Sequence, residues 1–420
     1  MKKVVNFFKD NLILIFLIAS ILHFNILSTI VYRGITYQSY SRSYISMLII
    51  SSILTIGLMI YKRFKKEYKL QIYDLLMLLM IIFACISTIY AINPYIAFNG
   101  VPGRYEGLYM ILYYIDLLYI SSFLDKKKKK IVVITFIVTA LYQTVYAILQ
   151  ITNQPFVRIA RNYGYIWANG TLHNPNFYAT YVLLGLSSAI GLLINSRDRL
   201  LRGILFIIVA ILLIGLFISN CMSGVVGLGI VLLYSFVYCL FNKRLYLIIV
   251  LAVLIGVILI LLTKTRSSVI VKDINTTNEQ ISEISKGNIK DNYGTNRIGL
   301  WSHLVTYIPK YWVHGCGIDN LQYMGTFNMI IVNKKYYDKA HNEYLHLLLT
   351  QGAFALGNYL LLIAVVVIRG MRNSYKNKEL YLILPVLGYI VQAFFNISVI
   401  EVAPFYFMFL GLLIERNKTS

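Results

Sequence analysis

Two histidines and two polar neighbours open a long apolar stretch near the C-terminal end of the sequence. The segment HNEYLH at 341–346 contains His341, Asn342, Glu343 and His346, and it begins an apolar stretch that continues to residue 369. Histidine is the side chain best suited to accept a proton near neutral pH. If a helix starts here, the positive end of its dipole disfavours the imidazolium and keeps His341 able to accept a proton. His341 is therefore a candidate catalytic base, although a solvated helix end would carry similar polar residues.

The neighbours of His341 have simpler interpretations. His346 lies five residues further along the expected helix and is rotated by about 140°, so we predict a packing role for it. Glu343 could cap its own helix or orient an imidazole nitrogen. The capping role is favoured because carboxylates stabilise the first turn of a helix.

Membrane helices must position these residues. The sequence is 58% hydrophobic and 13% charged and its mean hydropathy is +0.69, which excludes an ordinary soluble domain. We predict an all-α polytopic membrane protein with about twelve transmembrane helices, because a span needs an apolar stretch that crosses about 30 Å. The predicted spans are 11–32, 44–61, 72–92, 107–124, 131–151, 175–195, 202–219, 221–240, 245–263, 341–369, 380–397 and 402–415.

The positions of the basic residues predict the orientation of the chain. The net charge of +22 could suggest nucleic acid, but the lysines and arginines cluster in alternate connections, which is typical of a cytoplasmic membrane face. We therefore predict that both termini are cytoplasmic and that the first apolar stretch is an uncleaved helix rather than a signal peptide. The basic clusters lie at 2–3, 62–69, 125–130, 197–202, 242–244, 369–378 and 415–418.

The same topology places the long polar connections 93–106, 152–174 and 264–340 outside. The predicted organisation is nine transmembrane helices over 1–263, a large extracytoplasmic loop between the ninth and tenth helices over 264–340, and three helices over 341–420. Long loops on a rigid scaffold commonly carry function.

The large loop is predicted to begin as a polar linker and then to form a helix over 297–312. Thr295 or Asn296 is available as its N-cap, and Pro309 lies near its end. The apolar face of this helix is expected to rest at the membrane interface. The segment HGCGIDNLQY that follows predicts a glycine turn.

Several motifs, in this order, resemble the O-antigen ligase and polymerase family. They are GRYEGL at 103–108, GTLHNPNFYATYVL at 170–183, the Arg, Trp, Pro and G-x-G pattern within 297–317, and His341-Asn342 followed by Gly352. The family pattern has a second glycine where this sequence has Ala355. The resemblance covers most of the chain from about residue 70 onward.

The resemblance implies a membrane glycosyltransferase that moves a glycan from an undecaprenyl diphosphate carrier to an acceptor at the outer face of a bacterial plasma membrane. It implies a catalytic role for His341. Arginine binds phosphate oxygens bidentately with a permanent charge, and Asn174 and Asn176 have helix capping as their alternative role. The substrate-binding candidates are Arg104, Arg297, Arg161, Asn176 and Asn342.

Cofactors and metals are not expected. The outside connections contain no Asp-x-Asp pair and no His/Cys cluster at ligand spacing, although Asp319 and Glu106 could converge in the fold. The expected partners are the lipid-linked glycan donor, a glycan, lipid, protein or wall-polymer acceptor, and membrane lipids, without nucleic acid.

A transporter or flippase of lipid-linked glycans is the alternative function. Twelve spans are common among carriers, and the ionisable residues His23, Asp116 and Glu401, which are expected to be buried, could mark a pathway. The two halves show no repeat, and the Arg and His residues of the motifs are expected at the outside face rather than at the membrane midplane, which favours chemistry at the membrane surface. A scaffold protein would leave the order of the motifs unexplained.

Overall fold

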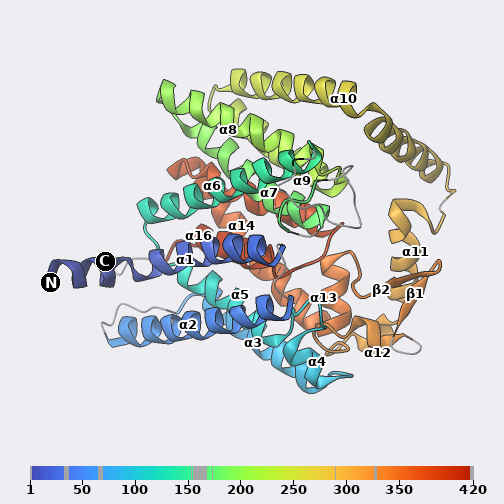
Figure 1. The fold of residues 1–420 in the computed structure, drawn as a ribbon. Helices are drawn as coiled ribbons and strands as arrows, with labels where there is room; N and C mark the ends of the chain where they lie inside the picture. Colours follow the sequence, from blue (N-terminus) through green and yellow to red (C-terminus); the bar gives the residue numbers. More distant parts are fainter. Residues whose placement is uncertain are drawn as a thin grey trace.

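The computed structural model shows a helical bundle with a small additional layer at one end (Figure 1). It describes residues 2–32, 37–64, 70–152, 154, 168–172, 174–288, 290–325 and 329–416. The helices of the bundle are α1 (Lys2–Tyr32), α2 (Tyr37–Phe64), α3 (Ile72–Ile89), α5 (Leu108–Ser121), α6 (Lys126–Ile151), α7 (Pro175–Asn195), α8 (Arg199–Ile218), α9 (Met222–Phe241), α10 (Leu245–Ser285), α14 (Ala353–Asn377), α15 (Leu380–Ala393) and α16 (Ala403–Leu413).

The additional layer consists of short elements. These are α4 (Pro94–Asn99), α11 (Tyr293–Val305), α12 (Ile308–Tyr311), a 3-10 helix (Leu321–Met324), the strands β1 (Ile330–Val332) and β2 (Lys335–Tyr337), and α13 (Glu343–Gln351). Figure 1 places α11, α12 and the two strands at the end of the bundle opposite to the N-terminal end of α1.

The protein is a multi-pass membrane protein. Within the described ranges, eight helices are long and apolar enough to span a membrane, namely α1, α2, α3, α6, α7, α8, α9 and α14. Four apolar helices are shorter, namely α5, the 245–261 part of α10, α15 and α16. Each of the twelve predicted spans therefore coincides with a helix, but the stretch 341–369 is divided at Gly352 into α13 and α14.

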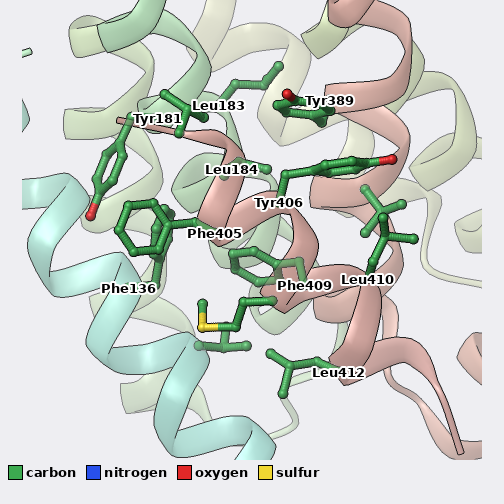
Figure 2. Packing of buried hydrophobic residues seen from close by; sticks show 14 of the residues in the cluster. Phe136, Tyr181, Leu183, Leu184, Tyr389, Phe405, Tyr406, Phe409, Leu410 and Leu412 are labelled. Atoms are coloured by element: carbon green, nitrogen blue, oxygen red, sulfur yellow. The ribbon is translucent and has the colours of Figure 1, made fainter. Parts of the chain in front are cut away.

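The core of the bundle lies around α7, which is almost entirely buried between α6, α8, α9 and α15. Figure 2 shows the rings of Phe136, Tyr181 and Phe405 close together there. Phe136 of α6 lies 4.6 Å from Tyr181 of α7 and 5.3 Å from Phe405 of α16, measured between ring centroids. Lipid tails are as apolar as these rings, so close packing rather than transfer from water holds the helices together. Such aromatic pairs contribute about 0.5–1.5 kcal/mol each beyond the area that they bury.

The predicted polar linker at the start of the large loop is wrong, because α10 continues as a helix as far as Ser285. The sequence between Gly256 and Gly287 contains neither glycine nor proline, so no residue ends the helix earlier. Gly287, with a φ of +82°, supplies the left-handed residue that commonly ends a helix. Figure 1 shows α10 as the longest helix, along one edge of the bundle.

The helix predicted over 297–312 is shorter than expected. Residues 294–296 have left-handed backbone angles, regular helix follows to Val305, and Pro309 lies in the first turn of α12 rather than at a helix end. Proline lacks an N–H and is tolerated at such a first turn. The Thr295 hydroxyl, a candidate N-cap, donates instead to the Gly294 carbonyl.

The apolar side chains of α11 pack into a small core of their own. Leu300 and Leu304 are buried in a cluster with Leu349 of α13, and Trp301 packs against its edge. Val305, another apolar residue of this helix, is 49% exposed. Leu300 and Leu304 therefore pack inside the protein and do not rest at the membrane interface, where the apolar face of this helix was predicted to lie.

The predicted all-α class is confirmed, and a short two-stranded antiparallel hairpin accompanies the helices. β1 pairs with β2 so that Val332 lies opposite Lys335. Asn333 and Lys334 between them have positive φ angles of 50° and 63°, which is the geometry of a type I′ turn. Asparagine tolerates this conformation, so the sequence VNKK carried a weak hairpin signal.

Candidate functional site

His341 precedes α13 rather than belonging to its first turn. Its φ is +50°, and Asn342 is the residue that caps the helix. The ring lies edge-on to Tyr337, with 5.9 Å between the centroids. Burial and the positive charges of Arg297 and Arg104 together lower the pKa of His341 to about 4, against the opposing effect of Asp338. The imidazole is therefore neutral at pH 7 and can accept a proton.

Arg104 comes from the turn between α4 and α5 and is held in place by Asp338. Its Nε donates to Asp338 Oδ2 at 2.6 Å, and a terminal nitrogen donates to Oδ1 at 3.2 Å. The guanidinium also lies 5.8 Å from the ring centroid of Phe177 near the start of α7. This bidentate pair orients the arginine beside His341 and leaves part of its side chain, 28%, exposed.

Arg297 begins the regular part of α11. One terminal nitrogen donates to the Thr295 hydroxyl at 3.1 Å, but the buried Nε has no hydrogen-bond partner in the described part of the chain. No carboxylate of the described residues pairs with it. A half-buried cation whose Nε is buried with an unused hydrogen is costly unless an anion accepts from it, so Arg297 is suited to bind an anion.

The two asparagine candidates serve helix ends. The Asn342 side chain accepts from the Leu345 backbone N–H at 3.0 Å and so caps α13. The predicted capping role of Asn174 is confirmed, because its side chain accepts from the Asn176 N–H at 2.8 Å. Asn176 itself accepts from the Cys221 thiol at 2.9 Å, which joins the starts of α7 and α9.

The structure thus brings His341, Arg104 and Arg297 together. Asn342 adjoins His341. Asn176 is hydrogen-bonded to Cys221, and Cys221 is close enough to Arg297 to affect the pKa of that arginine. Arg161 lies outside the described residues.

The capping role predicted for Glu343 is wrong. Its carboxylate is buried and accepts from the hydroxyls of Tyr359 at 2.8 Å and Tyr389 at 2.9 Å. Burial raises the pKa of Glu343 to about 7. The side chain turns away from its own helix end because two tyrosines from α14 and α15 offer hydrogen bonds there.

The argument from helical rotation for His346 is also wrong, since His341 is not in the helix. His346 lines a cavity of about 70 Å³ that is also lined by Lys339 and Glu343, on either side of His341 in the sequence. The buried Nδ1 of His346 has no hydrogen-bond partner within the described ranges. This volume holds several waters. The wall is apolar at Met80, Ile111, Leu347 and Phe407 and polar at Glu106, Asp319, Lys339, Glu343, His346 and Thr350.

The carboxylates of Glu106 and Asp319 do converge, but on an ammonium. Lys339 Nζ lies 2.8 Å from Glu106 Oε2 and 2.9 Å from Asp319 Oδ1. Within the described ranges, no three His, Cys, Asp or Glu residues are placed to hold a metal ion. The three residues Glu106, Asp319 and Lys339 form an ion triad. The part of Lys339 in it was not predicted from the sequence, because 233 residues separate Glu106 from Lys339. Its sequence signal is a charged residue inside each of the segments GRYEGL, GIDN and KAHNE.

The motif glycines let two turns pack against each other beneath the site. Gly352 has φ 90° and ψ 172°, a conformation essentially confined to glycine. A Cβ on Gly352 would lie 2.2 Å from the Val313 carbonyl oxygen, and one on Gly315 would lie 2.1 Å from the Thr350 carbonyl carbon. Ala355, which replaces the second glycine of the family pattern, is buried within α14.

Gly352→Ala is expected to destabilise the fold by about 1–3 kcal/mol through backbone strain, with a further cost from the clash at Val313. Thermal unfolding of the purified protein measures this. Gly357→Ala is the matched control, because its added Cβ meets nothing within 4 Å. Equal melting temperatures for the two variants would contradict the prediction.

The fold and the site together define a polytopic helical membrane protein with a neutral histidine and two arginines at one end of the bundle. Residues 207–360 match the family model described as O-Antigen ligase. This match supports the O-antigen ligase and polymerase family for the chain, and that family implies a function of the ligase or polymerase type. The matched range includes Arg297 and His341, whereas Arg104 and Asn176 precede it. No curated protein matches the chain.

Proposed function

We propose that the protein is a membrane glycosyltransferase that moves a glycan from an undecaprenyl diphosphate carrier to an acceptor at the outer face of the plasma membrane. The observation that carries this proposal is the neutral imidazole of His341 beside Arg104 and Arg297, of which the latter has a buried N–H without a partner in the described part of the chain. A phosphate-bearing donor supplies the anion that this arrangement lacks.

Each residue has a definite task in the reaction. The acceptor hydroxyl oxygen attacks the anomeric carbon of the donor glycan, and the bond from that carbon to the diphosphate oxygen breaks. His341 takes the hydroxyl proton, and the diphosphate leaves with the bonding electron pair. Arg297 and Arg104 bind its oxygens and stabilise the charge that develops there.

Metal independence follows from the same proposal. Two guanidinium groups supply the positive charge that a divalent cation supplies in other phosphate sites, and Asp338, the carboxylate beside Arg104, is already paired with it. No cofactor is needed for a transfer that breaks one C–O bond and forms another.

The proposed topology has both termini in the cytoplasm. The basic clusters at the ends of the helices support it. Figure 1 shows the N-terminal end of α1 and the C-terminal end of α16 on the side of the bundle away from α11, α12 and the hairpin. The site then faces the outside, where acceptors for surface glycans are found.

Transfer by the purified protein tests the proposal against the transporter alternative. The protein in lipid nanodiscs receives an undecaprenyl diphosphate-linked glycan and an acceptor, with and without chelator. We expect donor consumption that chelator does not change, and the length of the product separates a single transfer from polymerisation. Absence of transfer with every class of acceptor would contradict the enzyme.

Asp116→Asn distinguishes the two functions further. Asp116 accepts hydrogen bonds from Ser51 at 2.8 Å and Ser52 at 2.7 Å, which join α2 to α5. Asparagine retains an acceptor for these hydroxyls, so transfer is expected to stay near the wild-type rate. A carrier that uses this carboxylate as an ion site would lose its function, so loss of activity in a folded Asp116→Asn variant would favour the transporter.

The pH dependence of kcat/KM for the donor reports the free enzyme. The pKa of His341 is lowered to about 4, so the reactive neutral form is present above that pH and is lost only as the pH falls through it. We expect kcat/KM to stay nearly constant from about pH 8 down to about pH 5.5, since that range lies above the lowered pKa. A decline centred near the ordinary histidine pKa of about 6.5 would contradict the assigned environment.

A further inference from the structure

Lys339 is a buried cation two residues before His341. Its side chain is 2% exposed and contacts two carboxylates, Glu106 at 2.8 Å and Asp319 at 2.9 Å. Burial alone would lower the pKa of Lys339, but the charges of Asp319 and Glu106 outweigh it and raise the pKa, so the ammonium stays charged. The proposed reaction assigns no role to this triad.

The triad joins segments that carry different parts of the proposed site. Asp319 also accepts from the Val101 backbone N–H at 2.6 Å, at the start of the turn that presents Arg104. Glu106, at the end of that turn, accepts from the Tyr114 hydroxyl at 3.0 Å. Lys339 therefore fastens the His341 segment to the Arg104 turn and to α5.

The residues before His341 are anchored in succession. Asp338 binds Arg104, Lys339 binds the two buried carboxylates, and the Ala340 carbonyl accepts from the Trp301 indole N–H at 2.9 Å. The His341 ring has an edge-on contact with Tyr337. The place of the imidazole thus depends mainly on the backbone that these three anchors fix.

We infer that Lys339 is a positioning residue: with Glu106 and Asp319 it holds the backbone that aims His341 at the acceptor hydroxyl. This inference rests on the proposed function. Apolar side chains in place of a buried ion group often preserve stability, so stability alone does not require a charged triad here. A displacement of about 1 Å at a reacting group can cost as much as about 10²-fold in rate.

The test uses a variant that removes the charges together, because Lys339→Met alone would leave two uncompensated buried carboxylates. Glu106→Gln, Asp319→Asn and Lys339→Met are combined, since the two introduced amides keep acceptor oxygens for the Tyr114 hydroxyl and the Val101 N–H. The readouts are thermal unfolding, kcat and donor KM for transfer, and Trp301 emission after Trp167→Phe and Trp312→Phe leave it as the single tryptophan.

We expect the combined variant to fold, its Trp301 emission to change, and its kcat to fall roughly 10–100-fold while donor KM stays unchanged. The matched control combines Asp74→Asn with Arg416→Met. It removes another buried ion pair, 2.8 Å apart, at the first turn of α3. Wild-type kcat, lost kcat with unchanged emission, or an equal loss in the control would each overturn the inference.

Two further comparisons keep the outcomes separate. If wild type shows no transfer, the proposed function fails. If wild type transfers the glycan, His341→Ala does not, and the combined variant is fully active, only the role of Lys339 is rejected. Should the combined variant not fold, Asp319→Asn replaces it, because Lys339 keeps its contact with Glu106. Unchanged emission and kcat in that folded variant overturn the inference.

Discussion

Replacing His341 with alanine is expected to lower kcat for glycan transfer by roughly 10²–10⁴-fold, the usual contribution of a general base. Donor binding should be retained, because the arginines that bind the diphosphate are unchanged. The fold should also be retained, since His341 precedes α13 and the helix cap is Asn342. Initial rates of donor consumption, together with equilibrium binding of the donor, measure the two effects separately.

His303→Ala is the matched control for this substitution. His303 lies on α11, on the same end of the bundle, where its ring contacts Tyr307 with 5.4 Å between centroids. Wild-type rates are expected for it. Full activity of a folded His341→Ala protein would remove this imidazole from the mechanism, and loss of donor binding in that variant would assign it to binding instead.

The helices of the bundle were predictable because membrane insertion depends on the hydropathy of consecutive residues. All twelve apolar stretches coincide with helices. The break at Gly352 was not predicted, because apolar residues continue on both sides of it and hydropathy alone does not mark a break. Its cause lies in a distant segment: the Val313 carbonyl approaches the glycine, and only the fold brings the two together.

The segment after the ninth apolar stretch shows the limit of composition as a guide. Residues 264–285 are polar and rich in Ser, Thr and Asn, which suggested a linker, yet they continue α10. A helix that has already been nucleated extends by one hydrogen bond per residue, and no glycine or proline stops it before Gly287.

The candidate site was predictable to the extent that motifs carry it. His341, Arg104 and Arg297 each lie in a segment that resembles the family, and the structure brings them together. The positioning groups were not predictable: Lys339 meets Glu106 across 233 residues. Glu343 was assigned to its own helix end from local rules, whereas Tyr359 and Tyr389, from two later helices, determine its place.

Arg297→Gln is expected to weaken donor binding strongly. A hydrogen bond to a charged group contributes about 1.5–3 kcal/mol, so the Kd for the donor should rise roughly 10–150-fold. The buried Nε of Arg297, which has no partner in the described part of the chain, is the donor that a phosphate oxygen would satisfy. Titration with the undecaprenyl diphosphate-linked glycan, or with undecaprenyl diphosphate alone, measures the change, and Lys310→Gln on the exposed surface of α12 is the matched loss of charge.

The same substitution has a second effect with a definite sign. The positive charge of Arg297 is the second cause, after burial, of the low pKa of His341, so its removal lets that pKa rise above about 4. The acid limb of kcat/KM should therefore move to higher pH in Arg297→Gln and stay in place in Lys310→Gln. A weakened Kd without this movement would place Arg297 at the donor but away from His341, and an unchanged Kd would exclude it from the donor site.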